Sequence, residues 1–125
     1  MKKISAILLA VMLVFSVASV ASANGGLEIV SPVKNSTISS PPLSIGFTKP
    51  AIVSHYNVGV YQLSGGNARY TSGALAAPPI GGDYTLFHSL PSSFTSQMTP
   101  GTYYIYLEGY YSGGYYSDSG YFYLV

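Results

Sequence analysis

The chain contains no cysteine and no tryptophan, and only 7% of its 125 residues are charged. Without cysteine it has no disulfide framework, no cysteine-ligated zinc site and no thiol nucleophile. Its five basic and four acidic residues nearly balance, so no basic surplus would attract a nucleic acid or an anionic membrane. The chain is instead rich in turn-forming and aromatic residues, with 14 glycines, 8 prolines and 13 tyrosines. Its length suits one domain.

The N-terminus has the three parts of a secretory signal peptide. Residues 1–3 form a basic head, residues 6–15 are an unbroken apolar run, and residues 21–23 are a small-residue cleavage site. An uncleaved anchor is the alternative, because residues 4–23 are uncharged and almost long enough to span a bilayer. No basic stop-transfer cluster follows. We therefore expect cleavage and an exported mature domain of residues 24–125, without a stable membrane anchor.

The mature chain lacks the 3.6-residue period of a helix, and its short apolar runs alternate with clusters of glycine, proline, serine and asparagine. This pattern predicts an all-β domain. We expect strands at residues 27–30, 43–47, 56–63, 68–73, 84–89, 102–110 and 116–124. About seven short strands in roughly 100 residues, separated by regular turn signals, are typical of an antiparallel immunoglobulin-like β-sandwich.

Alternation along the strands predicts which side chains face the core. The more apolar set is Tyr56, Val58, Val60, Tyr103, Ile105, Leu107, Phe122 and Leu124. The opposite set is Asn57, Gly59, Tyr61, Tyr104, Tyr106, Glu108, Tyr121 and Tyr123. Tyr103 follows the tight turn at Pro100-Gly101, where sandwich folds often place a tyrosine corner. A Gly-Tyr-Tyr-Ser repeat around Gly113-Gly114 predicts a hairpin tip between the last two strands.

Tyrosines form the most distinctive cluster of the chain. The third, sixth and seventh strands are neighbours in one sheet of such a sandwich, so its outer face would carry Tyr61, Tyr104, Tyr106, Tyr121 and Tyr123. The adjoining hairpin would carry Tyr110, Tyr111, Tyr115 and Tyr116. Flat rings with hydroxyl edges suit sugar stacking and equally suit protein contacts. Cross-strand pairing that only stabilises the sheet is the third interpretation, and the sequence leaves all three open.

Ionisable groups suited to catalysis are few. Glu108 and Asp118 lie on consecutive strands and could approach each other like a glycosidase pair, but acids at strand edges are usually only solvated. Asp83, His88 and a serine could form a triad, but the chain has no Gly-x-Ser-x-Gly elbow. His55 and His88 are 33 residues apart, a separation without the spacing of a metal motif. We expect a non-enzymatic domain with no metal and no cofactor.

Asn35-Ser36-Thr37 is an acceptor motif for N-glycosylation. Such a motif is used only in a secreted protein of a eukaryote, and in a bacterium it would carry no meaning. We expect glycosylation at Asn35 if the source is eukaryotic.

Several stretches of the mature chain together resemble a known secreted module. The stretches are LEIVSP at 27–32, PLSIGF at 42–47, YNVGVY at 56–61, PGTYYIYL at 100–107 and YSDSGYFYL at 116–124. They resemble the immunoglobulin-like module of the yeast KRE/KNH cell-wall family, whose domains begin with an I-x-S-P strand and end with P-G-T-Y-x-I and Y-S-G-x-F motifs. The resemblance covers nearly the whole mature chain.

The resemblance implies a secreted or wall-associated β-sandwich linked to the organisation of fungal cell-wall β-1,6-glucan. It carries over no catalytic residue. Two features depart from the family: Leu86 or Phe87 stands where the family has an inward tryptophan, and the chain shows no Ser/Thr-rich tail or hydrophobic C-terminal segment for a GPI anchor. The resemblance therefore implies a single-domain form without that anchor.

These observations predict a secreted domain that acts at the cell wall or outside the cell. Its expected partner is a cell-wall polysaccharide or an extracellular protein. The alternative is a structural or adhesion subunit that self-associates through its tyrosines and edge strands, because an open strand edge accepts another strand.

Overall fold

The computed structural model describes residues 25–80 and 84–125. The expected signal peptide and Asp83 lie outside these residues. The described elements are β2 (Glu28–Ser31), β3 (Ser36–Ile38), β4 (Ser44–Thr48), β5 (His55–Gln62), β6 (Arg69–Thr71), β7 (Leu75–Ala76), β8 (Leu86–Ser89), α3 (Ser92–Thr95), β9 (Gly101–Tyr111) and β10 (Gly114–Leu124).

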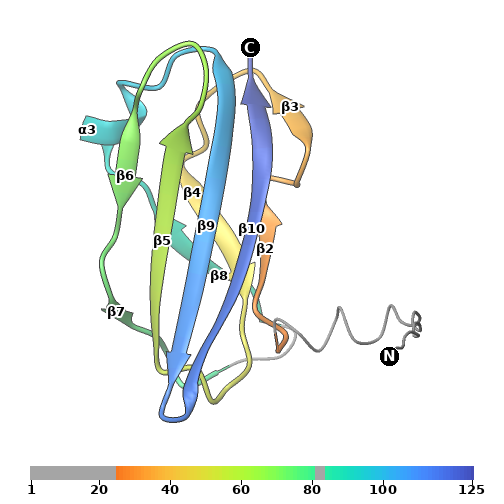
Figure 1. The fold of residues 1–125 in the computed structure, drawn as a ribbon, viewed down its shortest axis with the longest axis vertical. Coiled ribbons are helices and arrows are strands. Elements are labelled where there is room, and N and C mark those ends of the chain that lie inside the picture. The colour runs from red at the N-terminus through yellow and green to blue at the C-terminus, as the bar shows by residue number, and fades with distance from the viewer. Residues whose placement is uncertain (1–24, 81–83) are drawn as a thin grey trace, which may run out of the picture.

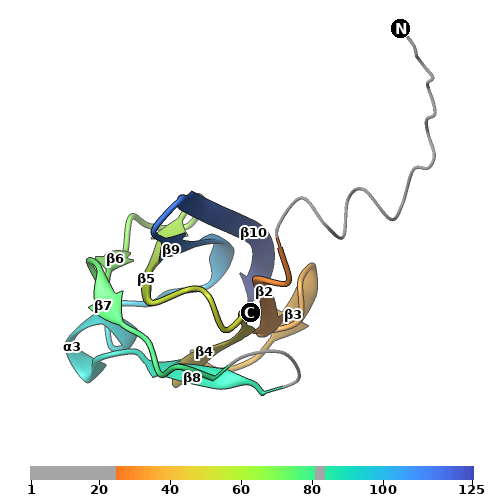
Figure 2. The ribbon, with the colours of Figure 1, turned by 90° about the horizontal axis from the view of Figure 1, so that it is seen from below.

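The strands form two sheets that pack as a sandwich. The larger sheet has the order β3-β10-β9-β5-β6, with β7 also paired to β5, and the smaller sheet has the order β2-β4-β8. Figure 2 shows the two layers end-on, with α3 beside one open edge and β2 and β3 at the other. This division of strands between two sheets is that of an immunoglobulin-like fold. The predicted all-β sandwich is confirmed.

All seven predicted strands are present, with ends that differ by a few residues. As expected, β5, β9 and β10 are adjacent, and they run side by side along the length of the molecule (Figure 1). The predicted hairpin tip is also confirmed, because Tyr111 pairs with Gly114 across Ser112 and Gly113. The hairpin lies at the end of the molecule opposite the C-terminus (Figure 1).

Three elements were missing from the prediction. Strands β3 and β7 have three and two residues, which is too short to show an apolar alternation. The third is the single helical turn α3, which buries Phe94. Strand β3 pairs in parallel with β10, so the larger sheet is mixed and not purely antiparallel as predicted. The physical reason is that the chain leaves the smaller sheet after β2 and continues alongside β10 in the same direction.

The core lies between the sheets and contains the predicted inward residues. Val58, Val60, Tyr103, Leu107 and Phe122 are each 0% exposed. Tyr56 is half-buried and packs against the same cluster. The rings of Tyr103 and Phe122 stack with centroids 5.1 Å apart and an angle of 8° between their planes. The alternation of β9 and β10 therefore sets their buried face, as predicted.

Tyr103 forms a tyrosine corner at the start of β9. Its hydroxyl donates a hydrogen bond to the backbone carbonyl of Thr99, with an O–O distance of 2.7 Å. Gly101 lets the chain approach β5 closely, because a Cβ at this position would overlap the carbonyl of Ser64. The turn before β9 is thus tied to the ring that anchors the strand, as the sequence predicted.

We expect Tyr103→Phe to lower the free energy of unfolding by about 0.5–1.5 kcal/mol, the net value of one hydrogen bond. The Thr99 carbonyl would keep a second donor, because Gln62 Nε2 lies 3.2 Å from it. Tyr123→Phe is the matched control, since this tyrosine is 38% exposed, and it should change stability by less than about 0.5 kcal/mol. Urea denaturation measures both, and equal losses would show that the corner adds no stability.

Candidate functional site: the tyrosine face of the larger sheet

The structure places the five predicted tyrosines on one side of β5, β9 and β10, facing away from the core. This follows from the strict alternation of buried and partly exposed residues along β9 and from the pairing of the three strands. We call this surface the tyrosine face, and it consists of Asn57, Tyr61, Tyr104, Tyr106, Glu108, Tyr110, Tyr115, Tyr121 and Tyr123. From Tyr104 to Tyr110 it extends roughly 20 Å along β9.

One row of the tyrosine face crosses three strands. Tyr61 pairs with Tyr104, and Tyr104 pairs with Tyr121. The rings of Tyr104 and Tyr121 have centroids 5.3 Å apart, and the ring of Tyr106 lies 6.5 Å from Tyr104 and within 17° of parallel. Tyr104 and Tyr106 are half-buried, whereas Tyr121 is 43% exposed. The rings of Tyr104, Tyr106 and Tyr121 thus form a continuous aromatic surface that solvent reaches, and Tyr61 lies beside them on β5.

The four hairpin tyrosines lie on the β9–β10 hairpin as predicted, and the structure divides them between its two faces. Tyr110 and Tyr115 lie on the tyrosine face, with centroids 6.2 Å apart. Tyr111 and Tyr116 lie on the opposite side, with centroids 4.9 Å apart, and Tyr116 packs against the core. The reason is that the hairpin strands extend to the turn, so the alternation of side chains continues through the repeat.

Glu108 is the acceptor at the centre of the tyrosine face. Its Oε2 accepts a hydrogen bond from the Tyr106 hydroxyl at 2.8 Å. Its Oε1 accepts one from the Tyr110 hydroxyl and a longer one from Asn57 Nδ2 at 3.4 Å. Both tyrosines are two residues from Glu108 on the same strand, so their rings lean toward it along β9. Glu108 is therefore held by hydrogen bonds, and the expectation that it is only solvated was wrong.

These hydrogen bonds shift the pKa of Glu108 and the pKa values of the two tyrosines in opposite directions. The bond from Tyr110 lowers the pKa of Glu108, because it stabilises the ionised carboxylate. The bond to Glu108 raises the pKa of Tyr106 and of Tyr110 to about 12. At neutral pH the carboxylate is charged while both phenols keep their protons and continue to donate.

Arg69 bounds the tyrosine face at β6. Its guanidinium carbon lies 5.4 Å from the centroid of the Tyr61 ring, a cation–π contact. The Tyr61 ring extends back along β5, since a Cβ at Gly59 would lie 2.7 Å from its hydroxyl. Because Gly59 has no side chain, the Tyr61 ring has space to lie against the sheet.

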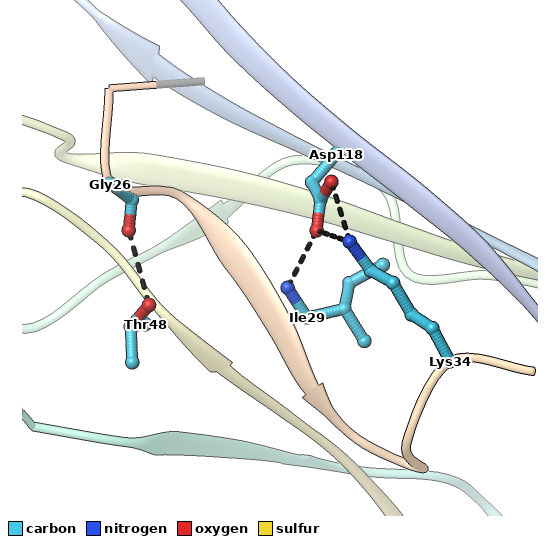
Figure 3. A network of polar contacts seen from close by, with 5 residues as sticks. All are labelled: Gly26, Ile29, Lys34, Thr48 and Asp118. Carbon is cyan, nitrogen blue, oxygen red and sulfur yellow. Dashed lines mark hydrogen bonds and ion pairs between the residues drawn. The ribbon is translucent and has the colours of Figure 1, made fainter. Parts of the chain in front are cut away.

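Glu108 and Asp118 lie on opposite faces of the larger sheet, so they are not brought together as a pair. Asp118 points into the edge of the sandwich between β10 and β2 (Figure 3). Its Oδ2 accepts a hydrogen bond from the backbone N–H of Ile29 at 2.8 Å and forms an ion pair with Lys34 Nζ at 2.7 Å. Asp118 therefore joins the two sheets, and the expectation that it is only solvated was wrong.

The two histidines are also separated. His55 is exposed and lies 3.0 Å from the Ser54 hydroxyl through its Nδ1. His88 is 9% exposed and points into the sandwich from the smaller sheet. Its Nδ1 is 2.9 Å from the Tyr56 hydroxyl and its Nε2 is 2.6 Å from the Tyr70 hydroxyl. A neutral imidazole satisfies both, since one ring nitrogen donates and the other accepts.

We expect stability to fall between pH 7.5 and pH 5.5 because of His88. Burial lowers the pKa of His88, so below its ordinary value of 6.5 the unfolded chain takes up a proton more readily than the folded chain. The stability that the neutral His88 contributes above pH 6.5 is therefore lost progressively as the pH falls toward the pKa of His88 in the folded protein. The loss at pH 5.5 is at most about 1.4 kcal/mol.

Thermal denaturation at the two pH values measures this effect. His88→Gln should remove most of the pH dependence, and His55→Gln should keep it because His55 is exposed. A dependence that disappears with His55→Gln and persists with His88→Gln would contradict the assignment.

Other features lie outside the tyrosine face. A shallow hollow of about 320 Å³ is lined by Glu28, Ile29, Val30, Val33 and Lys34, and it contains no aromatic residue. Asn35 is exposed in the turn before β3. Among residues 25–80 and 84–125, no helix is long and apolar enough to cross a membrane, and no three acidic or histidine side chains converge as metal ligands would.

Sequence reasoning found the face but missed part of its chemistry. The alternation in residues 104–108 placed Tyr104, Tyr106 and Glu108 on one side, and the same parity extended to Tyr110 would have added it. Alternation in residues 56–61 also placed Asn57 on the outward side, whereas Arg69 carries no comparable signal, because it joins the face through strand pairing with β5.

Comparisons with known proteins add little to this description. No protein-family model matches the chain, and no curated protein matches it. A crystal structure of an engineered protein is similar with a TM-score of 0.46 and 17% sequence identity, over 79% of this chain and 20% of that one. This chain thus spans about a fifth of the engineered protein's length, and a likeness at this level says nothing about function.

Proposed function

We propose that this chain is an exported, non-enzymatic domain that binds extracellular or cell-wall polysaccharide through its tyrosine face. The observation that carries the proposal is the contiguous row of Tyr61, Tyr104 and Tyr121, continued by Tyr106. Exposed aromatic rings beside hydrogen-bonding groups suit sugars, because a sugar has apolar C–H faces and a polar rim of hydroxyls. The KRE/KNH resemblance supports the same class of ligand.

The state of Glu108 supports a binding role over a hydrolytic one. A glycosidase acid needs a raised pKa to hold its proton at neutral pH, whereas the hydrogen bond from Tyr110 lowers the pKa of Glu108. Asp118 is turned to the other side of the sheet and is paired with Lys34. Glu108 and Asp118 therefore cannot both face the same bound sugar.

Co-sedimentation with insoluble polysaccharides tests the proposal. The panel consists of a β-1,3-glucan (curdlan), a β-1,6-glucan (pustulan) and cellulose, with agarose beads as a blank. We expect at least one of the three polymers to deplete the protein from solution, and NMR titration with its soluble oligosaccharide to shift the ring resonances of Tyr104 and Tyr121 before those of Tyr111. No depletion by any polymer, or shifts confined to residues outside the tyrosine face, would overturn the proposal.

Self-association through the tyrosine face is the second candidate, because its exposed aromatic area also suits a protein partner. The edge strands do not favour it: β3 and β6 have three residues each, and very short edge strands hinder strand addition. Light scattering across a concentration series separates the two. A mass that stays monomeric supports polysaccharide binding, and a mass that grows with concentration supports self-association.

A further inference from the structure

A network of hydrogen bonds surrounds the carboxylate of Glu108. Thr71 donates its hydroxyl to Asn57 Oδ1 at 3.1 Å, and Asn57 Nδ2 lies 3.4 Å from Glu108 Oε1. The hydroxyls of Tyr106 and Tyr110 donate to Oε2 and Oε1 of the same carboxylate. The hydroxyl protons of Tyr106 and Tyr110 are thus used within the protein.

The carboxylate of Glu108 keeps acceptor positions for a ligand, and the exposed Ser117 lies opposite it on β10. An ionised carboxylate has about four lone-pair positions, and Oε2 accepts from Tyr106 alone among the described contacts. The phenol oxygens of Tyr106 and Tyr110 also keep lone pairs after their protons are donated. A ligand that reaches this carboxylate can therefore donate hydrogen bonds to it, as sugar hydroxyls do.

Within residues 25–80 and 84–125, no lysine or arginine forms an ion pair with the carboxylate of Glu108. Arg69 on β6 is opposite Tyr61, and Glu108 on β9 is opposite Asn57. The charges of Arg69 and Glu108 therefore lie on either side of β5 and are separated by four residues along it. Four residues of strand span roughly 14 Å, which exceeds the Debye length of about 8 Å at physiological salt. His55 is the other ionisable group beside this centre, opposite Tyr110.

Building on the proposed polysaccharide binding, we infer that Glu108 makes the tyrosine face selective for neutral glycans and excludes acidic ones. The carboxylate accepts hydroxyl protons from an uncharged sugar chain that stacks on the flanking rings. A uronate or sulfate group at the same position would place a second negative charge beside Glu108. At contact distance such a like-charge pair lowers affinity by roughly tenfold at low salt.

Polymers that share a backbone and differ in charge test this inference. The matched pairs are curdlan with carboxymethyl-curdlan and hydroxyethyl-cellulose with carboxymethyl-cellulose, measured by depletion or affinity electrophoresis at pH 8, where histidine side chains are uncharged. We expect the wild type to bind the neutral member of a pair about tenfold more tightly at about 50 mM salt. The ratio should fall below about threefold at about 0.5 M salt, because salt screens the repulsion.

Glu108→Gln should bring the ratio below about threefold at low salt, since it removes the charge and keeps a side chain of the same size. Glu28→Gln is the matched control: it changes the net charge equally, but Glu28 lies on the smaller sheet, so the ratio should remain near the wild-type value. The double variant Tyr106→Phe/Tyr110→Phe keeps the carboxylate and should change both affinities by a similar factor. Circular dichroism confirms that each variant is folded.

The outcomes separate this inference from the function on which it rests. Equal binding of neutral and acidic members by the wild type at low salt would overturn the selectivity and leave polysaccharide binding intact. A preference for the neutral member that persists in Glu108→Gln, or disappears in Glu28→Gln, would show that Glu108 is not its source. Binding of no polymer at all would overturn both.

Discussion

Phe122→Ala should lower the free energy of unfolding by about 3–5 kcal/mol, the range for a large buried side chain that leaves a cavity. Phe122 is 0% exposed and its ring stacks on Tyr103 at 5.1 Å, so both burial and ring contact are lost. Ile105→Ala and Leu107→Ala should cost about 2–5 kcal/mol each, because these side chains are 2% and 0% exposed. Urea denaturation followed by circular dichroism measures all three.

Tyr121→Ala is the matched control for Phe122→Ala, because it removes an aromatic ring from the adjacent position of β10. Tyr121 is 43% exposed and its ring contact is with Tyr104, a cross-strand interaction of about 0.2–1 kcal/mol. The two variants should therefore differ by several-fold in lost stability. A loss at Tyr121 as large as that at Phe122 would contradict the assignment of the two faces.

The triple variant Tyr104→Ala/Tyr106→Ala/Tyr121→Ala should abolish co-sedimentation with the polysaccharide that the wild type binds. If each ring contributes about 0.5–1.5 kcal/mol through aromatic contact, the three together account for a loss of affinity of at least about tenfold. The three side chains lose mainly cross-strand contacts of about 0.2–1 kcal/mol each, which corresponds to a fall in melting temperature of about 2–20 °C for a domain of this size. Circular dichroism at the assay temperature therefore checks that the triple variant is folded.

Tyr111→Ala is the control for the triple variant. Tyr111 lies on the same hairpin but on the side opposite the tyrosine face, where its ring contacts Tyr116. It should keep wild-type binding. Full binding by the triple variant would rule out the tyrosine face as the binding surface, and loss of binding in Tyr111→Ala would move the site toward the hairpin tip.

Much of the fold was predictable because it depends on local patterns. The apolar runs that became β4, β5, β9 and β10 are bounded by glycine, proline and serine clusters, and alternation within them assigned the core positions. Tyr103 was placed at a tyrosine corner from the Pro100-Gly101 turn before it. Strands β3 and β7 and the helix α3 were not predicted, since strands of three and two residues show little alternation and a four-residue helix contains barely one turn.

The candidate site was predictable as a set of residues and not as a set of contacts. The Tyr-x-Glu-x-Tyr spacing of residues 106–110 put three side chains on one side of a strand. Nothing in that spacing showed that both hydroxyls converge on the carboxylate, or that Asn57 joins them from β5. For Asp118, the partners Ile29 and Lys34 are 89 and 84 residues away along the chain, so no local pattern could indicate them.

The sequence by itself determined the class of fold, the buried side of each long strand and the presence of an outer surface rich in tyrosine. It could do so because successive side chains of a strand point to opposite faces, a consequence of backbone geometry that needs no knowledge of neighbours. Only the tertiary structure decided that Tyr61, Tyr104 and Tyr121 form one row, that Tyr111 and Tyr116 leave the tyrosine face, and that Asp118 closes the sandwich edge. Those arrangements depend on strand order and register, which arise from many weak contacts between distant segments acting together.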